Sequence, residues 1–217
     1  MRSDWVPLSA SALVVGAMSL VFGTLLNPSR GGESSVQTLQ VVEQDGSRWL
    51  AMAVMYFFAS LALTLGLPAI LTLFERRGRK VGLAGVALFT VGAIGTCGFA
   101  MLMVFFRAMV VAHAVRPGAM DAVGNDHSLG AFLLAWIGSF YGGVLLIAIG
   151  LFLARTTPRW VPVLLLVFVA MLPFASHLGR VGMALQVLAL TVAFTGIAMA
   201  AVTGDSKRAV HTTQPAF

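Results

Sequence analysis

Long apolar segments alternate with short polar segments along the whole chain. Six segments are long and apolar enough to cross a bilayer, at about residues 5–26, 49–74, 81–106, 130–154, 160–178 and 181–203. A helix rises about 1.5 Å per residue, so about 20 apolar residues span the roughly 30 Å hydrocarbon core. The pattern therefore predicts an all-α integral membrane bundle of six transmembrane helices. It forms a single domain over residues 1–204, followed by a mobile cytoplasmic tail at 205–217.

The longest apolar run extends from Val81 to Val115 and follows a basic cluster at residues 76–80. Its only ionisable side chains are Arg107 and His113. As one helix it would be longer than the hydrocarbon core is thick, so it must tilt, bend or project from the membrane. We expect its far end to carry both side chains out of the lipid.

Small residues predict where the helices pack closely. In the third segment, Gly92, Thr96 and Ala100 recur every four residues, and in the fourth Gly138 and Gly142 form a GxxxG pattern, with Ala135, Ser139 and Gly143 alongside. Such stripes let two membrane helices approach each other, so we expect the third and fourth helices to meet.

Gly66 and Pro68 predict a kink near the end of the second segment, because proline removes a backbone hydrogen bond. Interrupted helices mark the sites of some transporters, but a Gly-x-Pro is also an ordinary bend. Between the third and fourth segments, the stretch Asp126-His127-Ser128 precedes an apolar run and is expected to cap the helix that follows.

The polar segment at residues 27–48 contains a predicted amphipathic helix. Ser34 or Ser35 can cap it, and apolar residues follow at helical spacing: Val36, Leu39 and Val42. We expect this helix to lie on the membrane surface, as an interaction surface or as a simple connector.

The charge pattern predicts the orientation. Only 10% of residues are charged, against about 25% in soluble domains, and the net charge is +6. The basic residues lie in short loops rather than on one polar face, which argues against nucleic acid. With both termini cytoplasmic, nine of the 14 Lys and Arg residues face the cytoplasm, as the positive-inside rule requires. We expect a multi-pass protein of a bacterial inner (cytoplasmic) membrane.

Chemistry-bearing residues are scarce within the predicted helices. No Asp, Glu or Lys lies in mid-membrane, which argues against a proton- or sodium-coupled carrier. The single cysteine, Cys97, excludes an intramolecular disulfide and a cysteine-based metal site. No nucleophile or zinc-protease motif is present. We therefore expect a protein that is not an enzyme and holds no cofactor or metal.

The remaining polar residues gather toward the outer ends of the third, fifth and sixth helices. They are Arg107, His113, His177, Arg180 and Gln186. If these helices are neighbours, the five side chains can line an outward-facing pocket for an anionic headgroup or a carboxylate. In the alternative interpretation, the arginines reach separately to lipid phosphates and the histidines lie in the interface.

Three functions remain open. The first is an accessory subunit that binds another membrane protein or a second copy of itself, or a binder of lipid-like molecules at the outer face. The second is a small-molecule transporter or channel with its site between the second and third helices. The third is a b-type haem protein with His113 and His177 as axial ligands.

One stretch carries a resemblance. The first helix ends in NPSRGG, a Ser-led helix follows, and DGSRW opens the second helix. Over residues 13–73 this arrangement resembles uncharacterised small multi-span membrane proteins of GC-rich bacteria. The resemblance implies a membrane location and no substrate, so no site residues follow from it.

Overall fold

The computed structural model describes residues 5–29, 34–74, 77–175 and 179–212. Within these ranges the chain is all-α and contains no strand. Its helices are α1 (Trp5–Leu26), α2 (Ser35–Gln44), α3 (Gly46–Leu71), α4 (Arg79–Val111), α5 (Pro117–Gly124), α6 (His127–Ala154), α7 (Trp160–Ala170), α8 (Leu172–Ala175) and α9 (Gly179–Thr212). Helix α9 continues past residue 204, where the sequence predicted a mobile tail; residues 213–217 lie outside the described part.

Five helices of the described chain are long and apolar enough to cross a membrane: α1, α3, α4, α6 and residues Val181–Gly204 of α9. The predicted fifth segment is different, because it is divided into α7, with 11 residues, and the short α8. Pro173 lies just after this break, and its ring nitrogen cannot donate to the carbonyl of Val169. The apolar run itself continues through the interruption, so hydrophobicity alone does not mark it, whereas Pro173 does.

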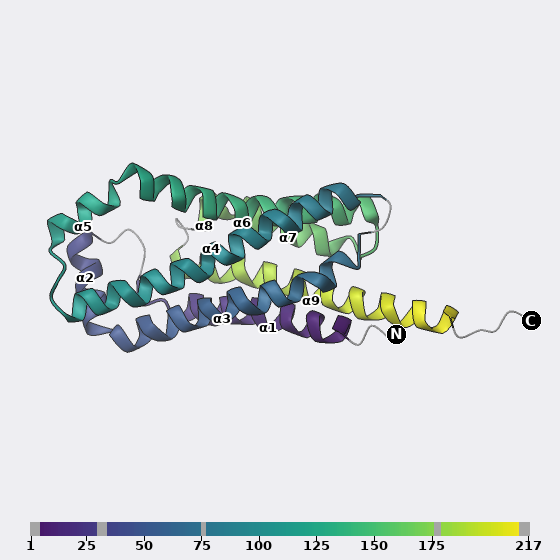
Figure 1. Ribbon diagram of the computed structural model, residues 1–217, viewed down its shortest axis with the longest axis horizontal. Coiled ribbons are helices and arrows are strands. Elements are labelled where there is room, and N and C mark those ends of the chain that lie inside the picture. The colour runs from purple at the N-terminus through teal and green to yellow at the C-terminus, as the bar shows by residue number, and fades with distance from the viewer. Residues whose placement is uncertain (1–4, 30–33, 75–76, 176–178, 213–217) are drawn as a thin grey trace, which may run out of the picture.

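The long helices run side by side along the bundle (Figure 1), and their contacts with one another and with α7 close a ring. Helix α1 packs against α3 and α9, α3 against α4, α4 against α6, α6 against α7, and α7 against α9. Helices α2 and α5 lie together at one end of the bundle, and the start of α1 lies toward the opposite end. We call these the α2/α5 end and the basic end. Helix α4 therefore has α3 and α6 as its neighbours, not α7 or α9.

Helices α4 and α6 meet through glycine, as the sequence predicted. A Cβ atom added at Gly143 would lie 2.4 Å from the backbone nitrogen of Phe89, and one added at Gly92 would lie 2.5 Å from the Cα of Phe140. The predicted Gly138 is not part of this contact, because nothing lies within 4 Å of its Cβ position. The predicted face is therefore confirmed in part: Gly142, whose Cβ position lies 3.1 Å from the Leu88 side chain, and Gly143 beside it face α4, whereas Gly138 lies on an exposed side of α6.

Pro68 lies inside α3, and α1 supplies the hydrogen bonds around it. The Ser9 hydroxyl donates to the carbonyl of Leu65 at 2.9 Å and accepts from the backbone nitrogen of Ala69 at 3.0 Å. Gly66 allows this approach, because its Cβ position lies only 2.7 Å from the Cα of Leu13. The opening near Pro68 is thus occupied by a side chain of the neighbouring helix.

Helices α2 and α5 cover one end of the bundle. Ser34 caps α2 in a capping box with Gln37, and Val42 on its inner face is fully buried. The Ser35 hydroxyl donates to the Asp121 carboxylate and so joins α2 to α5. Asp126 caps α6 by accepting from the backbone nitrogen of Leu129 at 2.7 Å. The predicted helix at this end is confirmed, and of the candidate caps that the sequence offered, Ser34 and Asp126 are the ones used.

The two ends differ in charge. Among the described side chains, the basic end carries five cations and no carboxylate: Arg77, Arg79, Lys80, Arg155 and Arg159. The α2/α5 end carries three arginines and four carboxylates: Arg48, Arg107, Arg116, Glu43, Asp45, Asp121 and Asp126.

Candidate functional site

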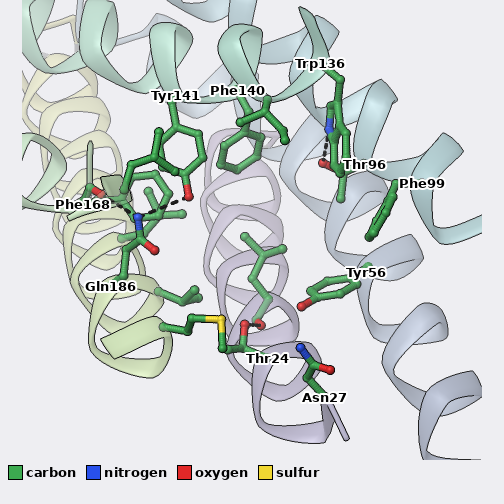
Figure 2. A pocket seen from close by; sticks show the side chains of 16 residues that line it. Thr24, Asn27, Tyr56, Thr96, Phe99, Trp136, Phe140, Tyr141, Phe168 and Gln186 are labelled. Atoms are coloured by element: carbon green, nitrogen blue, oxygen red, sulfur yellow. Dashed lines mark hydrogen bonds between the residues drawn. The ribbon is translucent and has the colours of Figure 1, made fainter. Parts of the chain in front are cut away.

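The ring of helices encloses a pocket in the half of the bundle nearer α2 and α5 (Figure 2). Its volume is about 320 Å³, and residues of α1, α3, α4, α6, α7, α8 and α9 line it. This volume is near the lower end of the range for small-molecule sites, roughly 300–1,000 Å³. The pocket is therefore large enough for a small ligand or for part of a longer one.

Aromatic side chains fill the centre of the helix bundle on the side of the pocket that faces the basic end. The ring centroids of Phe89 and Phe140 are 4.9 Å apart, and Phe194 meets Phe89 edge-on at 5.8 Å. These residues come from α4, α6 and α9, so together they bridge the centre of the ring. Phe140 also lines the pocket, which therefore ends at this aromatic cluster.

Gln186 is the most deeply buried polar side chain of the pocket, with 5% of its surface exposed. Its amide nitrogen donates to the carbonyl of Phe168 at 2.9 Å and to the hydroxyl of Tyr141 at 3.2 Å. Because α7 ends at Ala170, the Phe168 carbonyl lacks the next turn as a partner, and Gln186 replaces it. The Gln186 carbonyl oxygen accepts no hydrogen bond from the described residues and remains available to a ligand.

Tyr141 is held by stacking as well as by Gln186. Its ring lies parallel to that of Phe168, with an interplanar angle of 4° and centroids 4.9 Å apart. Its hydroxyl oxygen accepts from Gln186, so its proton can be donated elsewhere. Tyr141 and Gln186 thus present one donor and one acceptor at the same wall of the pocket.

A second polar group lies at another wall of the pocket, formed by α1 and α3 (Figure 2). The hydroxyl of Tyr56 interacts with the Thr24 side chain, and Asn27 lines the pocket nearby. The Tyr56 ring lies on Gly23, whose Cβ position is only 2.7 Å from the Cε1 atom of the ring. Any larger residue than glycine would displace this ring.

Trp136 forms the wall where α4 and α6 separate. Its ring nitrogen donates to the carbonyl of Gly92 at 3.0 Å and to the hydroxyl of Thr96 at 3.2 Å, and its ring stacks on Phe99 at 4.7 Å. No side chain between residues 127 and 139 of α6 is buried. Trp136 is therefore the last strong contact between the two helices before they diverge.

Among the described residues, the lining contains no Asp, Glu, Lys, Arg or His residue. Hydrocarbon and aromatic side chains form most of it, and the described polar groups are two phenols, two amides, two threonine hydroxyls and the indole N–H of Trp136. Within the described residues no cluster of His, Cys, Asp and Glu could hold a metal ion. Such a pocket suits an uncharged, largely apolar molecule with few hydrogen-bonding groups.

The five predicted site residues do not all lie at the pocket. Gln186 lines the pocket, whereas the Arg107 guanidinium donates to the carbonyl of Gly46 at 2.7 Å and thereby joins α4 to α3. His113 is exposed just after α4. His177 and the side chain of Arg180 lie outside the described part. The five-residue cluster stays a prediction, and of its members only Gln186 is seen in the pocket.

Sequence reasoning missed both tyrosines. The chain contains only two, Tyr56 and Tyr141, and both line the pocket. Their hydroxyls were a usable signal, because a buried tyrosine hydroxyl needs a hydrogen-bonding partner. The predicted cluster was built mainly on ionisable groups, and Gln186 was its only neutral member.

These observations define the class of the protein. Five apolar helices in one ring, with lipid as the environment that suits their exposed faces, make it a multi-pass membrane protein. No protein-family model, curated protein or solved structure matches the chain.

Proposed function

We propose that the protein is a non-enzymatic accessory protein of a bacterial inner membrane that binds an uncharged, lipid-like molecule in its central pocket. The observation that carries this proposal is the lining formed by the described residues, which is apolar and uncharged but contains the Gln186 carbonyl, to which no described residue donates. An apolar ligand chain is already well solvated by lipid, so it binds to the protein only where a cavity of matching shape receives it. The hydrogen-bonding groups then select the head of the molecule.

The ligand class follows from the polar groups at the α7–α9 wall. A hydroxyl on the ligand can donate to the Gln186 carbonyl and accept from the Tyr141 hydroxyl. The hydrocarbon part then lies against apolar residues such as Leu20, Phe99 and Leu190. We infer an acyl or isoprenoid chain that carries one hydroxyl or carbonyl group. The sequence suggested an anionic ligand, but the described lining supports an uncharged one, because none of the described lining residues is a cation that could balance a buried charge.

The separation of α4 and α6 supports entry from the bilayer. Phe132 and Leu134, on the first turns of α6, are 67% and 73% exposed, so apolar side chains on several sides of this helix face outward. Trp136 lies at the fork where the pocket begins. A lipid-like molecule can therefore reach the pocket sideways between these helices without crossing water.

Six crossings with both termini cytoplasmic form part of the proposal. Helix α6 ends at the basic end and α9 begins nearer the α2/α5 end, so the chain returns through α7 and α8 (Figure 1). Together these span residues 160–175, about 24 Å of helix at 1.5 Å per residue, which is somewhat less than the hydrocarbon core. The five cations at the basic end support a cytoplasmic location for that end.

Cysteine labelling of intact cells tests this topology. In a Cys97→Ala background, Gln40→Cys and Arg77→Cys place one exposed thiol at each end. We expect a membrane-impermeant maleimide to label the first variant in intact cells and the second only after lysis. The opposite pattern would invert the proposed orientation.

Co-purification tests the lipid-binding proposal. The protein is purified in mild detergent, and its bound lipids are extracted and identified by mass spectrometry. We expect one uncharged lipid class to be enriched over the membrane average and to fall about fivefold in Gln186→Leu and in Tyr141→Phe, since each variant loses one hydrogen bond to the ligand worth about 1 kcal/mol. Thr90→Val, which changes a hydroxyl outside the pocket that bonds within its own helix, is the matched control. A wild-type protein without an enriched uncharged lipid would overturn the proposal.

A transporter remains the second candidate, because the pocket ends at the Phe89, Phe140 and Phe194 cluster. This cluster can act as a closed gate toward the basic end. Flux of the identified lipid in proteoliposomes, increased by Phe89→Ala, would favour transport. Saturable binding without flux in either variant would favour the accessory role.

A further inference from the structure

A second pocket lies at the basic end, between the end of α6 and the start of α7. Its volume is about 470 Å³. One part of its lining is apolar, with Leu151, Phe152 and Pro162, and another part is polar, with Arg155, Thr157 and Arg159. This lining is therefore amphipathic, unlike the uncharged lining of the central pocket.

The two arginines of this pocket have no partner in the described chain. Neither Arg155 nor Arg159 forms an ion pair or a side-chain hydrogen bond there. Arg77, Arg79 and Lys80 add to the positive charge of the same end. Two uncompensated guanidinium groups beside one pocket favour an anionic occupant, since each offers a planar fork of donors.

Thr157 supplies an independent indication of a missing partner. Its hydroxyl is buried and has no hydrogen-bonding partner, whereas the hydroxyl of the adjacent Thr156 donates to the carbonyl of Leu73 at 2.8 Å. Among the described buried side-chain nitrogen and oxygen atoms, the Thr157 hydroxyl is the only one without a partner. Buried polar groups are almost always satisfied, so a ligand atom is the natural partner for this one.

We propose that this pocket binds the phosphate group of an anionic phospholipid. Arg155, Arg159 and the Thr157 hydroxyl donate to the phosphate oxygens, and an acyl chain lies along Phe152 and Pro162. Trp160, which is 42% exposed at the start of α7, suits the headgroup boundary where such a phosphate lies. Basic pockets between membrane helices are known to recognise headgroups of this kind. The site is independent of the central pocket and of the lipid proposed for it.

Native mass spectrometry of the delipidated full-length protein in mild detergent tests the site. Phosphatidylglycerol, phosphatidylcholine and inorganic phosphate are titrated separately. We expect phosphatidylglycerol to bind at least about tenfold more tightly than phosphatidylcholine, and millimolar phosphate not to displace it. Displacement by phosphate alone, with no preference for phosphatidylglycerol, would identify a free-phosphate site and overturn the lipid assignment.

Three variants separate binding from folding. Arg155 has a φ of 56°, a conformation that favours glycine, so Arg155→Gly removes the guanidinium without straining the backbone. Arg159→Gln removes the second charge, and Thr157→Val removes the hydroxyl at nearly constant volume. We expect each to weaken phosphatidylglycerol binding by about tenfold or more, with unchanged or raised thermal stability.

Arg77→Gln and Lys80→Gln are the matched controls, because these exposed cations do not line the pocket. We expect them to change binding less than twofold. If they weaken binding as much as Arg159→Gln does, general surface charge accounts for the effect and the pocket is excluded as the site. Unchanged binding in Arg155→Gly, Arg159→Gln and Thr157→Val would exclude it as well.

Discussion

The hydroxyl of Ser9 in α1 lies 3.0 Å from the backbone nitrogen of Ala69 in α3 and accepts its hydrogen bond. The same hydroxyl donates to the carbonyl of Leu65. In an uninterrupted helix these two backbone groups bond to each other. One serine therefore restores the hydrogen bonding beside Pro68, and it couples the first two long helices in the chain.

Replacing Ser9 by alanine should destabilise the bundle by about 1–3 kcal/mol, because two backbone groups lose a buried partner. Ser11→Ala is the control, since the Ser11 hydroxyl is exposed and bonds within its own helix. Unfolding in mixed micelles, followed by tryptophan fluorescence, compares the two variants. Equal stabilities would show that the Ser9 contact contributes nothing.

The glycine contacts between α4 and α6 lead to a second prediction. Gly143→Ala should destabilise the protein by about 1–3 kcal/mol, because the added methyl group would overlap the backbone of Phe89. Gly138→Ala should be neutral or stabilising by up to about 1 kcal/mol, since that position is open and alanine favours helix. The same unfolding assay measures the stability of both variants. If Gly138→Ala destabilises the protein more than Gly143→Ala does, Gly138 lies in the contact with α4, as the GxxxG pattern suggested.

Gly23 controls the shape of the central pocket through Tyr56. Gly23→Ala should push the Tyr56 ring toward the pocket and reduce the amount of co-purified lipid about tenfold, while leaving Gln186 and Tyr141 intact. Gly98→Ala adds a methyl group in open space and should leave lipid binding unchanged. Quantitative mass spectrometry of extracted lipid measures both. Equal lipid content in the two variants would contradict a role for the α1–α3 wall.

Arg107 should act in folding and not in ligand binding. Arg107→Gln should destabilise the protein by about 1.5–3 kcal/mol, the usual range for a hydrogen bond to a charged group, discounted toward the lower value because the side chain is only partly buried. His113→Ala should change neither stability nor lipid content, because His113 is exposed. Loss of bound lipid in either variant at unchanged stability would support the outward-facing cluster that the sequence predicted.

Residue order alone was enough to predict an all-α membrane bundle, the long helix through Arg107, the contact between the third and fourth helices, and the short stretches that contain the caps Ser34 and Asp126. These features depend on neighbours within a few turns or on the apolar length of one segment, so local pattern carries them. Pro68 could be recognised from the sequence in the same way. The serine of another helix that occupies the opening beside Pro68 could not.

Tertiary structure decided the rest. The uniformly apolar fifth segment hides the break between α7 and α8, and four-residue spacing cannot say which side of α6 meets α4. The central pocket depends on the order of helices around the ring, which brings Tyr56, Tyr141 and Gln186 together across large sequence separations. In lipid, side chains facing outward and inward are equally apolar, so hydrophobic pattern loses the distinction that marks a core in water.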